Sequence, residues 1–336
     1  MCLNYFFIMN ILFVGSRDHR HSSAGGYDKI ALYPGANSLS DKDVIFGSIP
    51  VGTRGKCINV FFRDIYARFL RNRYDIVHFF YGDTILLPYR HSRKHKIVAT
   101  IHLDVAQHNR LPSLFIKALK SIDGVVVLGS HQAEVLRKQY SINAVFIPHG
   151  FSKPEFTLVD LEPLNHISMD DYVNIFVSGT NYRDMDLLQK SIEYLEGCRK
   201  NVFFHVVGQT SAMIRKLNMF KNVFCYPRLS DDEYFTLLSR CDYNFLPLTF
   251  ATANNALLEA QFLGVKSILP EIPGITDYAA PYPMNLFYNS FNHLKEVLLS
   301  INKEQISTDI IKFSERFLWA NIYNKLANYY FNIMKL

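Results

Sequence analysis

The chain has 336 residues, of which 49% are hydrophobic and 20% are charged, and its net charge is +6. This length suits about two domains, and the composition excludes an intrinsically disordered chain. No run reaches the ~18 consecutive apolar residues of a membrane-spanning helix. The apolar start, MCLNYFFIMN, lacks the basic region and the cleavage site of a signal peptide, and Met1 and Met9 are both candidate start residues.

Cysteine usage and the distribution of charge indicate the compartment and the partners. The five cysteines are scattered without zinc-site spacing, which favours reduced thiols and a cytoplasmic protein. Residues 1–152 carry 19 Lys and Arg against 10 Asp and Glu, whereas the remainder has a small acidic excess. We therefore expect the first half to face an anionic acceptor or lipid surface. No nucleic-acid-binding module is recognised, so nucleic acid is not an expected partner.

In chain order, the first half alternates short apolar runs with helical stretches. The predicted strands are Asn10–Val14, Asp43–Phe46, Asp75–Tyr81, Lys96–His102, Gly124–Leu128 and Ala144–Pro148. Helices are predicted at Asn59–Arg73 and Ser130–Tyr140. Apolar strands that alternate with helices indicate a parallel sheet covered on both faces.

The second half repeats this alternation after a break. Residues 153–171 contain prolines and acids without a clear period, and they read as a linker. The strands predicted after it are Val173–Ser178, Val202–Val207, Val223–Tyr226, Tyr243–Leu246 and Ser267–Leu269. The predicted helices are Asp184–Leu195, Asp231–Arg240 and Asn255–Phe262. Two doubly wound domains, 1–152 and 172–309, are thus expected to face each other across a ligand-binding cleft. Residues 310–336 read as a helical region that can pack back on the first domain.

The strongest chemical signal lies in Thr249–Tyr278, where a polar loop precedes a helix. Either Thr252 or Asn254 is placed to cap this helix, and the N–H groups at its start, around Asn254, Asn255 and Ala256, suit a diphosphate. Glu259 lies about one turn further on, where a carboxylate can accept hydrogen bonds from both hydroxyls of a ribose. The alternative is a capped amphipathic helix with a solvated glutamate.

The run LLEAQFLGVKSILPEIPGITDY resembles the donor-site signature of the retaining GT-B glycosyltransferases of family GT4. That signature has two glutamates separated by seven residues, then a glycine, an apolar strand and a loop of the type GGIPE. The resemblance implies the GT-B fold, with two Rossmann-like domains, and a ribose-binding role for Glu259. The position of the first glutamate is Ala251, which leaves the contacts to the donor sugar and the stereochemical outcome open. The run Thr252–Asn255 would substitute with hydroxyl, amide and backbone donors.

The resemblance extends through the first half. The loop after the first strand contains Gly25 and Gly26, which the resemblance places near the acceptor and the donor phosphates. The run YDIVHFF resembles a family strand that ends in histidine, which puts His78 on the acceptor side. The run KIVATIHLD resembles the family's T-x-H strand, which makes His102 the candidate catalytic residue. The alternatives are a simple glycine turn and a structural histidine.

In the second half, the run VNIFVSGTNYRDMDLLQKSI resembles the family's strand, loop and helix that carry a cation for the diphosphate, and Arg183 falls near that cation. Tyr226, Pro227 and Arg228 are implied neighbours of the nucleotide base. The pair Asp184 and Asp186 fits a D-x-D metal motif, but it opens a helix, where acids favour the dipole. No metal site is therefore expected. Nucleotide-binding and zinc-peptidase motifs such as GxGxxG, GxxxxGK[ST] and HExxH are absent.

Aromatic and arginine side chains alternate over Asn59–Tyr74, and the basic run Arg90–Lys96 follows. Such a helix suits an anionic membrane surface. The alternative is a core-facing helix whose arginines are solvated.

The resemblance implies a metal-independent hexosyltransferase of class EC 2.4, without a cofactor, that uses a UDP- or GDP-sugar. The acceptor is expected to be a glycan or a lipid-linked glycan in bacterial surface polysaccharide synthesis, with retention of configuration. The expected location is cytoplasmic, on the inner face of the membrane. Two alternatives remain, a non-catalytic GT-B binding or scaffold subunit and a GT-B sugar-nucleotide epimerase.

Overall fold

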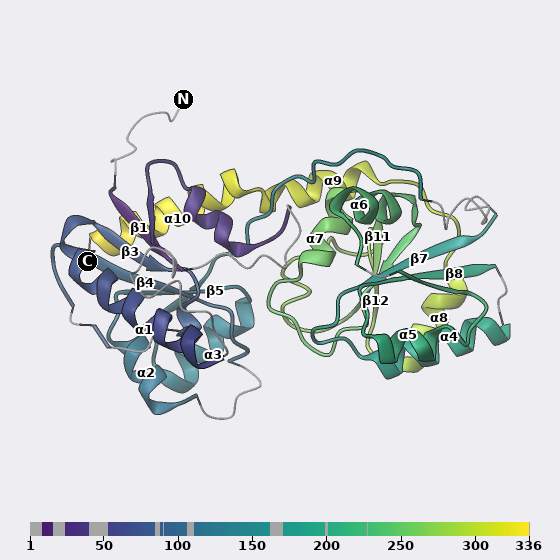
Figure 1. Cartoon of the computed structure of the whole chain (residues 1–336), viewed down its shortest axis with the longest axis horizontal. Helices are drawn as coiled ribbons and strands as arrows, with labels where there is room; N and C mark the ends of the chain where they lie inside the picture. Colours follow the sequence, from purple (N-terminus) through teal and green to yellow (C-terminus); the bar gives the residue numbers. More distant parts are fainter. Residues whose placement is uncertain are drawn as a thin grey trace. The chain divides into compact units, whose positions relative to one another are not determined.

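The structure is a computed structural model that describes residues 9–15, 24–39, 53–84, 88–89, 91–105, 111–161, 171–198, 201–226 and 228–335. The chain divides into two compact units, one of residues 1–21, 26–150 and 319–336, the other of residues 22–25 and 151–318. Each unit is built on a six-stranded parallel sheet with flanking helices (Figure 1). The predicted α/β fold with two doubly wound domains is therefore confirmed. The strand expected at Asp43–Phe46 lies outside the described residues.

The sheet of the first unit has the strand order β2-β1-β3-β4-β5-β6. Its strands are β1 (Ile11–Val14), β2 (Asn37–Leu39), β3 (Ile76–Phe79), β4 (Lys96–Ile101), β5 (Gly124–Val127) and β6 (Ala144–Phe146). Its α-helices are α1 (Thr53–Leu70), α2 (Ser113–Lys120), α3 (Ser130–Tyr140) and α10 (Trp319–Met334), and a 3-10 helix, η1, spans Tyr27–Leu32. Strands β1, β3, β4 and β5 are buried along their whole length, as a parallel sheet covered on both faces requires.

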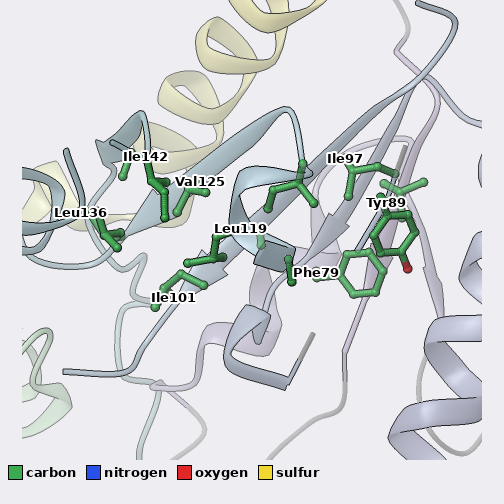
Figure 2. Close-up of a cluster of buried hydrophobic side chains, with 14 of the residues drawn as sticks. Phe79, Tyr89, Ile97, Ile101, Leu119, Val125, Leu136 and Ile142 are labelled. Atoms are coloured by element: carbon green, nitrogen blue, oxygen red, sulfur yellow. The ribbon is translucent and has the colours of Figure 1, made fainter. Parts of the chain in front are cut away.

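Successive side chains along the strands of the first unit point to opposite faces of the sheet. On one face, side chains such as Phe79, Ile97 and Val125 form one core with Leu119 of α2 and Leu136 of α3 (Figure 2). On the other face, His78 of β3 contacts Tyr330 of α10, so the last helix of the chain completes the first unit. Truncating a fully buried leucine such as Leu136 to alanine would cost about 2–5 kcal/mol of stability.

The sheet of the second unit has the order β12-β11-β10-β7-β8-β9. Its strands are β7 (Val173–Ser178), β8 (Val202–Val207), β9 (Val223–Tyr226), β10 (Tyr243–Phe245), β11 (Lys266–Pro270) and β12 (Leu286–Tyr288). Its α-helices are α4 (Met185–Cys198), α5 (Ser211–Leu217), α6 (Asp231–Arg240), α7 (Asn255–Phe262), α8 (Phe291–Ser300) and α9 (Thr308–Ser314). Helices α4, α5 and α8 share one core with the sheet, and α6 and α7 share another on the opposite face.

The stretch 310–334, expected as one helical region, is divided between the two units. Helix α9 is followed by a 3-10 turn, η6 (Glu315–Phe317), after which Leu318 adopts an extended conformation. Leu318 forms a parallel bridge with Phe151, and the Phe151 N–H donates to the Phe317 carbonyl at 2.8 Å. This pairing interrupts the helix, so α10 begins at Trp319 as a separate element.

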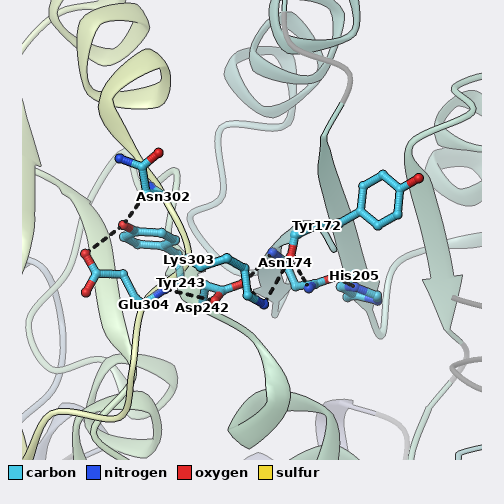
Figure 3. Close-up of polar contacts among 8 residues, drawn as sticks. All are labelled: Tyr172, Asn174, His205, Asp242, Tyr243, Asn302, Lys303 and Glu304. Atoms are coloured by element: carbon cyan, nitrogen blue, oxygen red, sulfur yellow. Dashed lines mark hydrogen bonds and ion pairs between the residues drawn. The ribbon is translucent and has the colours of Figure 1, made fainter. Parts of the chain in front are cut away.

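A buried polar network holds the amino ends of strands β7 and β10 (Figure 3). The Asp242 carboxylate accepts hydrogen bonds from the backbone N–H groups of Asn174 and Glu304, at 2.7 and 3.0 Å. The Lys303 ammonium pairs with the same carboxylate at 3.1 Å. These contacts fasten the segment after α8 to the sheet. Doubly wound sheets bind their ligands at the carboxyl ends of the strands. The network lies at the amino ends and is therefore on the opposite edge of the sheet.

Candidate functional site

Two loops at the carboxyl ends of β7 and β10 are joined by backbone hydrogen bonds. The Asp184 N–H donates to the Pro247 carbonyl at 2.7 Å, and the Thr249 N–H donates to the Tyr182 carbonyl at 3.0 Å. Between these bonds, Arg183 forms an antiparallel bridge with Leu248. The loop that carries Arg183 is therefore held against the polar loop that leads into α7.

The N-terminus of α7 is capped as the sequence predicts, and Asn254 is the capping residue. Its backbone is extended, and its side-chain oxygen accepts a hydrogen bond from the Leu257 N–H at 3.1 Å. Thr252, Asn255 and Ala256 lie beside this cap and are partly exposed. The N–H groups of the first helical turn are those that a phosphate group can use.

The loop after β11 packs directly on the residues before this cap. Gly274 has φ +85°, and a Cβ atom at this position would lie 2.0 Å from the Ala251 carbonyl oxygen. Ala251 itself is buried. Only glycine fits here, so the loop after β11 approaches the α7 loop through backbone rather than through side chains.

Glu259, the predicted ribose-binding residue, is buried at 5% exposure. Its Oε2 accepts a hydrogen bond from the Tyr234 hydroxyl at 2.7 Å, and that hydroxyl is 3.0 Å from the Ser178 Oγ. Burial raises the pKa of Tyr234, and the neighbouring Glu259 carboxylate raises it further. Tyr234 therefore remains a neutral donor that orients this carboxylate.

Arg183, the predicted cation, belongs to the same cluster. Its Nε donates to the Ser178 carbonyl at 2.9 Å and its Nη1 to the Asn181 carbonyl at 3.2 Å. Burial lowers the pKa of the guanidinium to about 10, and the nearby Tyr234 and Glu259 oppose this change. Arg183 therefore remains charged at neutral pH, beside the buried carboxylate.

The structure thus brings Arg183 and Glu259 together, through partners that the sequence reasoning missed. Ser178 contacts both Arg183 and Tyr234, and Tyr234 contacts Glu259. Ser178 is the last residue of β7, and residues at that position commonly face a ligand in this type of fold. Nothing in the sequence marks Tyr234, since it is an ordinary residue of helix α6.

The predicted base neighbours differ in their surroundings. The Tyr226 ring is buried at 4% exposure, and its hydroxyl is 2.9 Å from His205 Nδ1. The ring is therefore enclosed in the unit and offers no open face for stacking. The Tyr226 carbonyl accepts a hydrogen bond from the Gly208 N–H at 3.2 Å. Arg228 is exposed, and Pro227 lies outside the described residues.

In the first unit, His102 lies just after β4, at the carboxyl end of the sheet. Its Nε2 donates to the Phe80 carbonyl at 2.9 Å, and its ring is 4.8 Å from the rings of Tyr27 and Tyr81. The Asp83 carboxylate accepts hydrogen bonds from the backbone N–H groups of His102 and Leu103, at 2.8 and 2.7 Å. Asp83, which the sequence reasoning did not single out, therefore fixes the position of this histidine.

The remaining candidates are His78 and Gly25, predicted for the acceptor side, and Gly26, predicted for the donor. His78 is fully buried, and its two ring nitrogens face the hydroxyls of Tyr330 and Thr100. Burial lowers its pKa to about 3, so the ring is neutral, and it has no exposed surface with which to contact an acceptor. Gly25 and Gly26 are both buried, and Gly26 has φ +101°, a conformation that favours glycine.

Within the part of the chain that the structure covers, no three His, Cys, Asp or Glu side chains converge as metal ligands would. In the D-x-D pair, Asp184 accepts a hydrogen bond from the Leu187 N–H at 2.8 Å, which is a helix cap. No helix among the described ranges is both long and apolar enough to cross a bilayer.

No family model matches the sequence, and no curated protein matches it. Solved structures do match the fold. Sucrose-phosphate synthase from Thermosynechococcus elongatus superposes with a TM-score of 0.71 at 13% identity, over 97% of this chain and 99% of its own. Anabaena HepE in complex with UDP-glucose gives 0.67 at 13% identity, over 95% and 98%. The lipopolysaccharide outer core galactosyltransferase WaaB gives 0.67 at 16% identity, over 98% and 100%. The chain therefore has the two-domain GT-B fold of these glycosyltransferases.

Proposed function

We propose that the protein is a glycosyltransferase that moves a sugar from a nucleotide-sugar donor, a UDP- or GDP-sugar, to a glycan or lipid-linked glycan. The observation that carries this proposal is the convergence of Arg183 and Glu259 beside the capped N-terminus of α7. The GT-B fold supports it, because structures with this fold include HepE in complex with UDP-glucose. Retention of configuration and independence of metal ions are parts of the same proposal.

In this mechanism, the second unit holds the nucleoside diphosphate. The N–H groups of Asn255 and Ala256 and the Arg183 guanidinium bind the two phosphates, whose negative charge grows as the glycosidic bond breaks. Arginine has five N–H donors, and its contacts to two carbonyls orient the guanidinium for this role. The Glu259 carboxylate accepts hydrogen bonds from the ribose hydroxyls, and Arg228 lies beside the base.

The first unit provides the acceptor side in this proposal. His102 faces the donor sugar and the acceptor, and its Nε2 is committed to the Phe80 carbonyl, which fixes the ring orientation. Gly26 of this unit and Gly25, which belongs to the second unit, contribute backbone groups.

Helix α1 supports an anionic membrane or lipid-linked acceptor as the partner of the first unit. Aromatic side chains of this helix are exposed, and one of its arginines is buried. Arg63 is 2% exposed and paired with Asp64, whereas Tyr66 and Phe69 are 44% and 76% exposed. Exposed aromatic side chains on a helix of a basic unit are typical of an interfacial contact. In the basic run 90–96, Arg93 and Lys94 are exposed. Lys96 is buried, and its Nζ lies 3.8 Å from Asp123 Oδ1.

Donor binding and turnover test this function. We expect one member of a panel of UDP- and GDP-sugars to raise the melting temperature of the purified protein, because a ligand of the folded state stabilises it. Glu259→Gln keeps the volume but removes the charge, and two charge-assisted hydrogen bonds are lost or weakened. A loss of donor affinity of about 100-fold is expected. Glu193→Gln, on the exposed face of α4, is the matched control and should bind as the wild type does.

Ala251 keeps a second candidate open, a non-catalytic subunit that binds a nucleotide sugar. A buried alanine stands where a second carboxylate is expected for the donor sugar. Binding without transfer or hydrolysis, across a panel of acceptors, would favour this alternative. Conversion of the free donor into an isomer, without an acceptor, would favour a sugar-nucleotide epimerase. Unchanged donor affinity in Glu259→Gln would refute the assigned donor site.

A further inference from the structure

Two non-glycine residues among those described have a positive φ, and only one of them has an ordinary explanation. Ser141, with φ +55°, ends helix α3. Its N–H donates to the Arg137 carbonyl, and the next N–H, of Ile142, donates to the Leu136 carbonyl. This is the left-handed cap with which many helices end. The conformation of Ser141 therefore follows from local helix geometry.

Tyr182 also has φ +55°, but it lies in the loop between β7 and α4, three residues before that helix starts. A bulky side chain is an outlier in this conformation, because its Cβ crowds the backbone. The loop is held in place by Thr249, whose N–H and hydroxyl both donate to the Tyr182 carbonyl, at 3.0 and 3.3 Å. Glycine or asparagine would occupy the position with less strain. Strain of this kind persists where the surrounding structure fixes the backbone, and it is concentrated at active sites and ligand-binding loops.

The side chain that this strain supports is an exposed aromatic ring. Tyr182 is 56% exposed, while its ring centroid is 5.2 Å from that of the buried Phe250 at an interplanar angle of 73°. The edge-to-face contact limits the movement of the ring without burying it. The residue immediately following is Arg183, whose guanidinium belongs to the proposed diphosphate site. An exposed aromatic ring with restricted movement thus lies next in sequence to the arginine of the proposed diphosphate site.

The direction of the loop indicates which part of the donor this ring meets. The proposed base neighbours follow β9, on one side of β7 in the sheet. The loop of Tyr182 is bonded to residues 247–249 after β10, on the opposite side of β7. We propose that Tyr182 is a positioning residue whose ring packs against the apolar C–H face of the sugar in the bound nucleotide sugar. This inference rests on the proposed function and extends it to the sugar.

The test compares binding of a nucleotide sugar with binding of its nucleoside diphosphate. Wild type and Tyr182→Gly are titrated by calorimetry with UDP-glucose and UDP, and with GDP-mannose and GDP. Glycine is the chosen substitution because it adopts this backbone without strain, so the loop conformation is preserved. We expect about a ten-fold loss of affinity for the nucleotide sugar and less than about a two-fold change for the nucleoside diphosphate.

Two further variants give the controls. Tyr182→Phe keeps the ring and should retain wild-type affinity within about two-fold. Ser141→Gly relieves the same backbone conformation in the other unit, and it should leave all four affinities unchanged. Equal losses for the nucleotide sugar and the nucleoside diphosphate, no loss at all, or a loss in Tyr182→Phe as large as in Tyr182→Gly would each overturn the inference alone. A wild type that binds none of the four ligands would overturn the proposed function and, with it, this inference.

Discussion

Each sheet contains one fully buried histidine, and we predict that these two residues make the protein sensitive to mild acid. His205 Nε2 lies 2.9 Å from the Asn174 side-chain oxygen, and the Asn174 amide nitrogen donates to the Tyr172 carbonyl (Figure 3). The oxygen is therefore an acceptor, Nε2 carries the proton, and Nδ1 accepts from the Tyr226 hydroxyl. Protonated Nδ1 could no longer accept from the Tyr226 hydroxyl, and protonation would bury a charge.

The magnitude follows from the pKa values. Burial lowers the pKa of His205 and of His78 to about 3, whereas an unfolded histidine has a pKa of ~6.5. As the pH falls below ~6.5, the unfolded state takes up protons that the folded state excludes, so stability decreases. Relative to pH 7 and above, each histidine lowers the free energy of unfolding by about 2 kcal/mol at pH 5 and by about 4 kcal/mol at pH 3.

Urea unfolding at pH 7.5 and pH 5 measures this effect. Trp319, the single tryptophan of the chain, lies in the first unit with His78 and reports on that unit by fluorescence, while circular dichroism follows both units. In His205→Gln, the second unit should lose about 2 kcal/mol less between the two pH values than it does in the wild type. The fluorescence transition of the same variant should keep the wild-type pH dependence. An unaltered pH dependence of the second unit would refute the reasoning.

Three further predictions concern the second unit. In urea denaturation, Gly274→Ala should destabilise this unit by several kcal/mol, because the added Cβ would lie 2.0 Å from the Ala251 carbonyl oxygen, and it should also weaken donor binding. The control is Gly208→Ala, at φ +73° with no atom within 4 Å of the added Cβ, which should cost only about 1 kcal/mol in the same assay. Asn254→Ala removes the cap of α7 and should cost about 1 kcal/mol, with a parallel loss of affinity for UDP in calorimetry. Asp242→Ala leaves buried N–H donors without their acceptor and should lower stability by about 3–5 kcal/mol, with donor affinity per folded molecule unchanged.

Much of the fold follows from local patterns in the sequence. Strands β7 and β8 have the predicted bounds, Val173–Ser178 and Val202–Val207, because each is a mainly apolar run that a glycine follows. Helix α6 has its predicted bounds because Ser230 and Glu233 form a capping box at its start. Strand β2, Asn37–Leu39, was missed, because it is three residues long and only its last residue is buried.

The candidate site was predictable only in part. The cap at Asn254 and the depth of Glu259 along the helix are local properties, so the sequence indicates both. The hydroxyl that orients Glu259 comes from Tyr234, which lies 25 residues earlier in the chain, and only the packing of α6 beside α7 brings them together. Helix α1 shows the same limit. Helical spacing alone does not tell which side of α1 faces the core, and Arg63 is buried because Asp64 pairs with it.

The charges of the proposed donor cluster limit the class of ligand that it can bind. Arg183 is held by carbonyl oxygens and Glu259 by the Tyr234 hydroxyl, so each charge has a neutral partner of its own. A ligand must therefore present an anionic group to the arginine and hydroxyl donors to the carboxylate. Inorganic pyrophosphate offers an anionic group to Arg183 but no hydroxyl donors to Glu259, and the Glu259 carboxylate repels it. A nucleoside diphosphate offers both, because its ribose separates the phosphates from the base and provides the hydroxyls. We therefore expect pyrophosphate to compete poorly with UDP for this site.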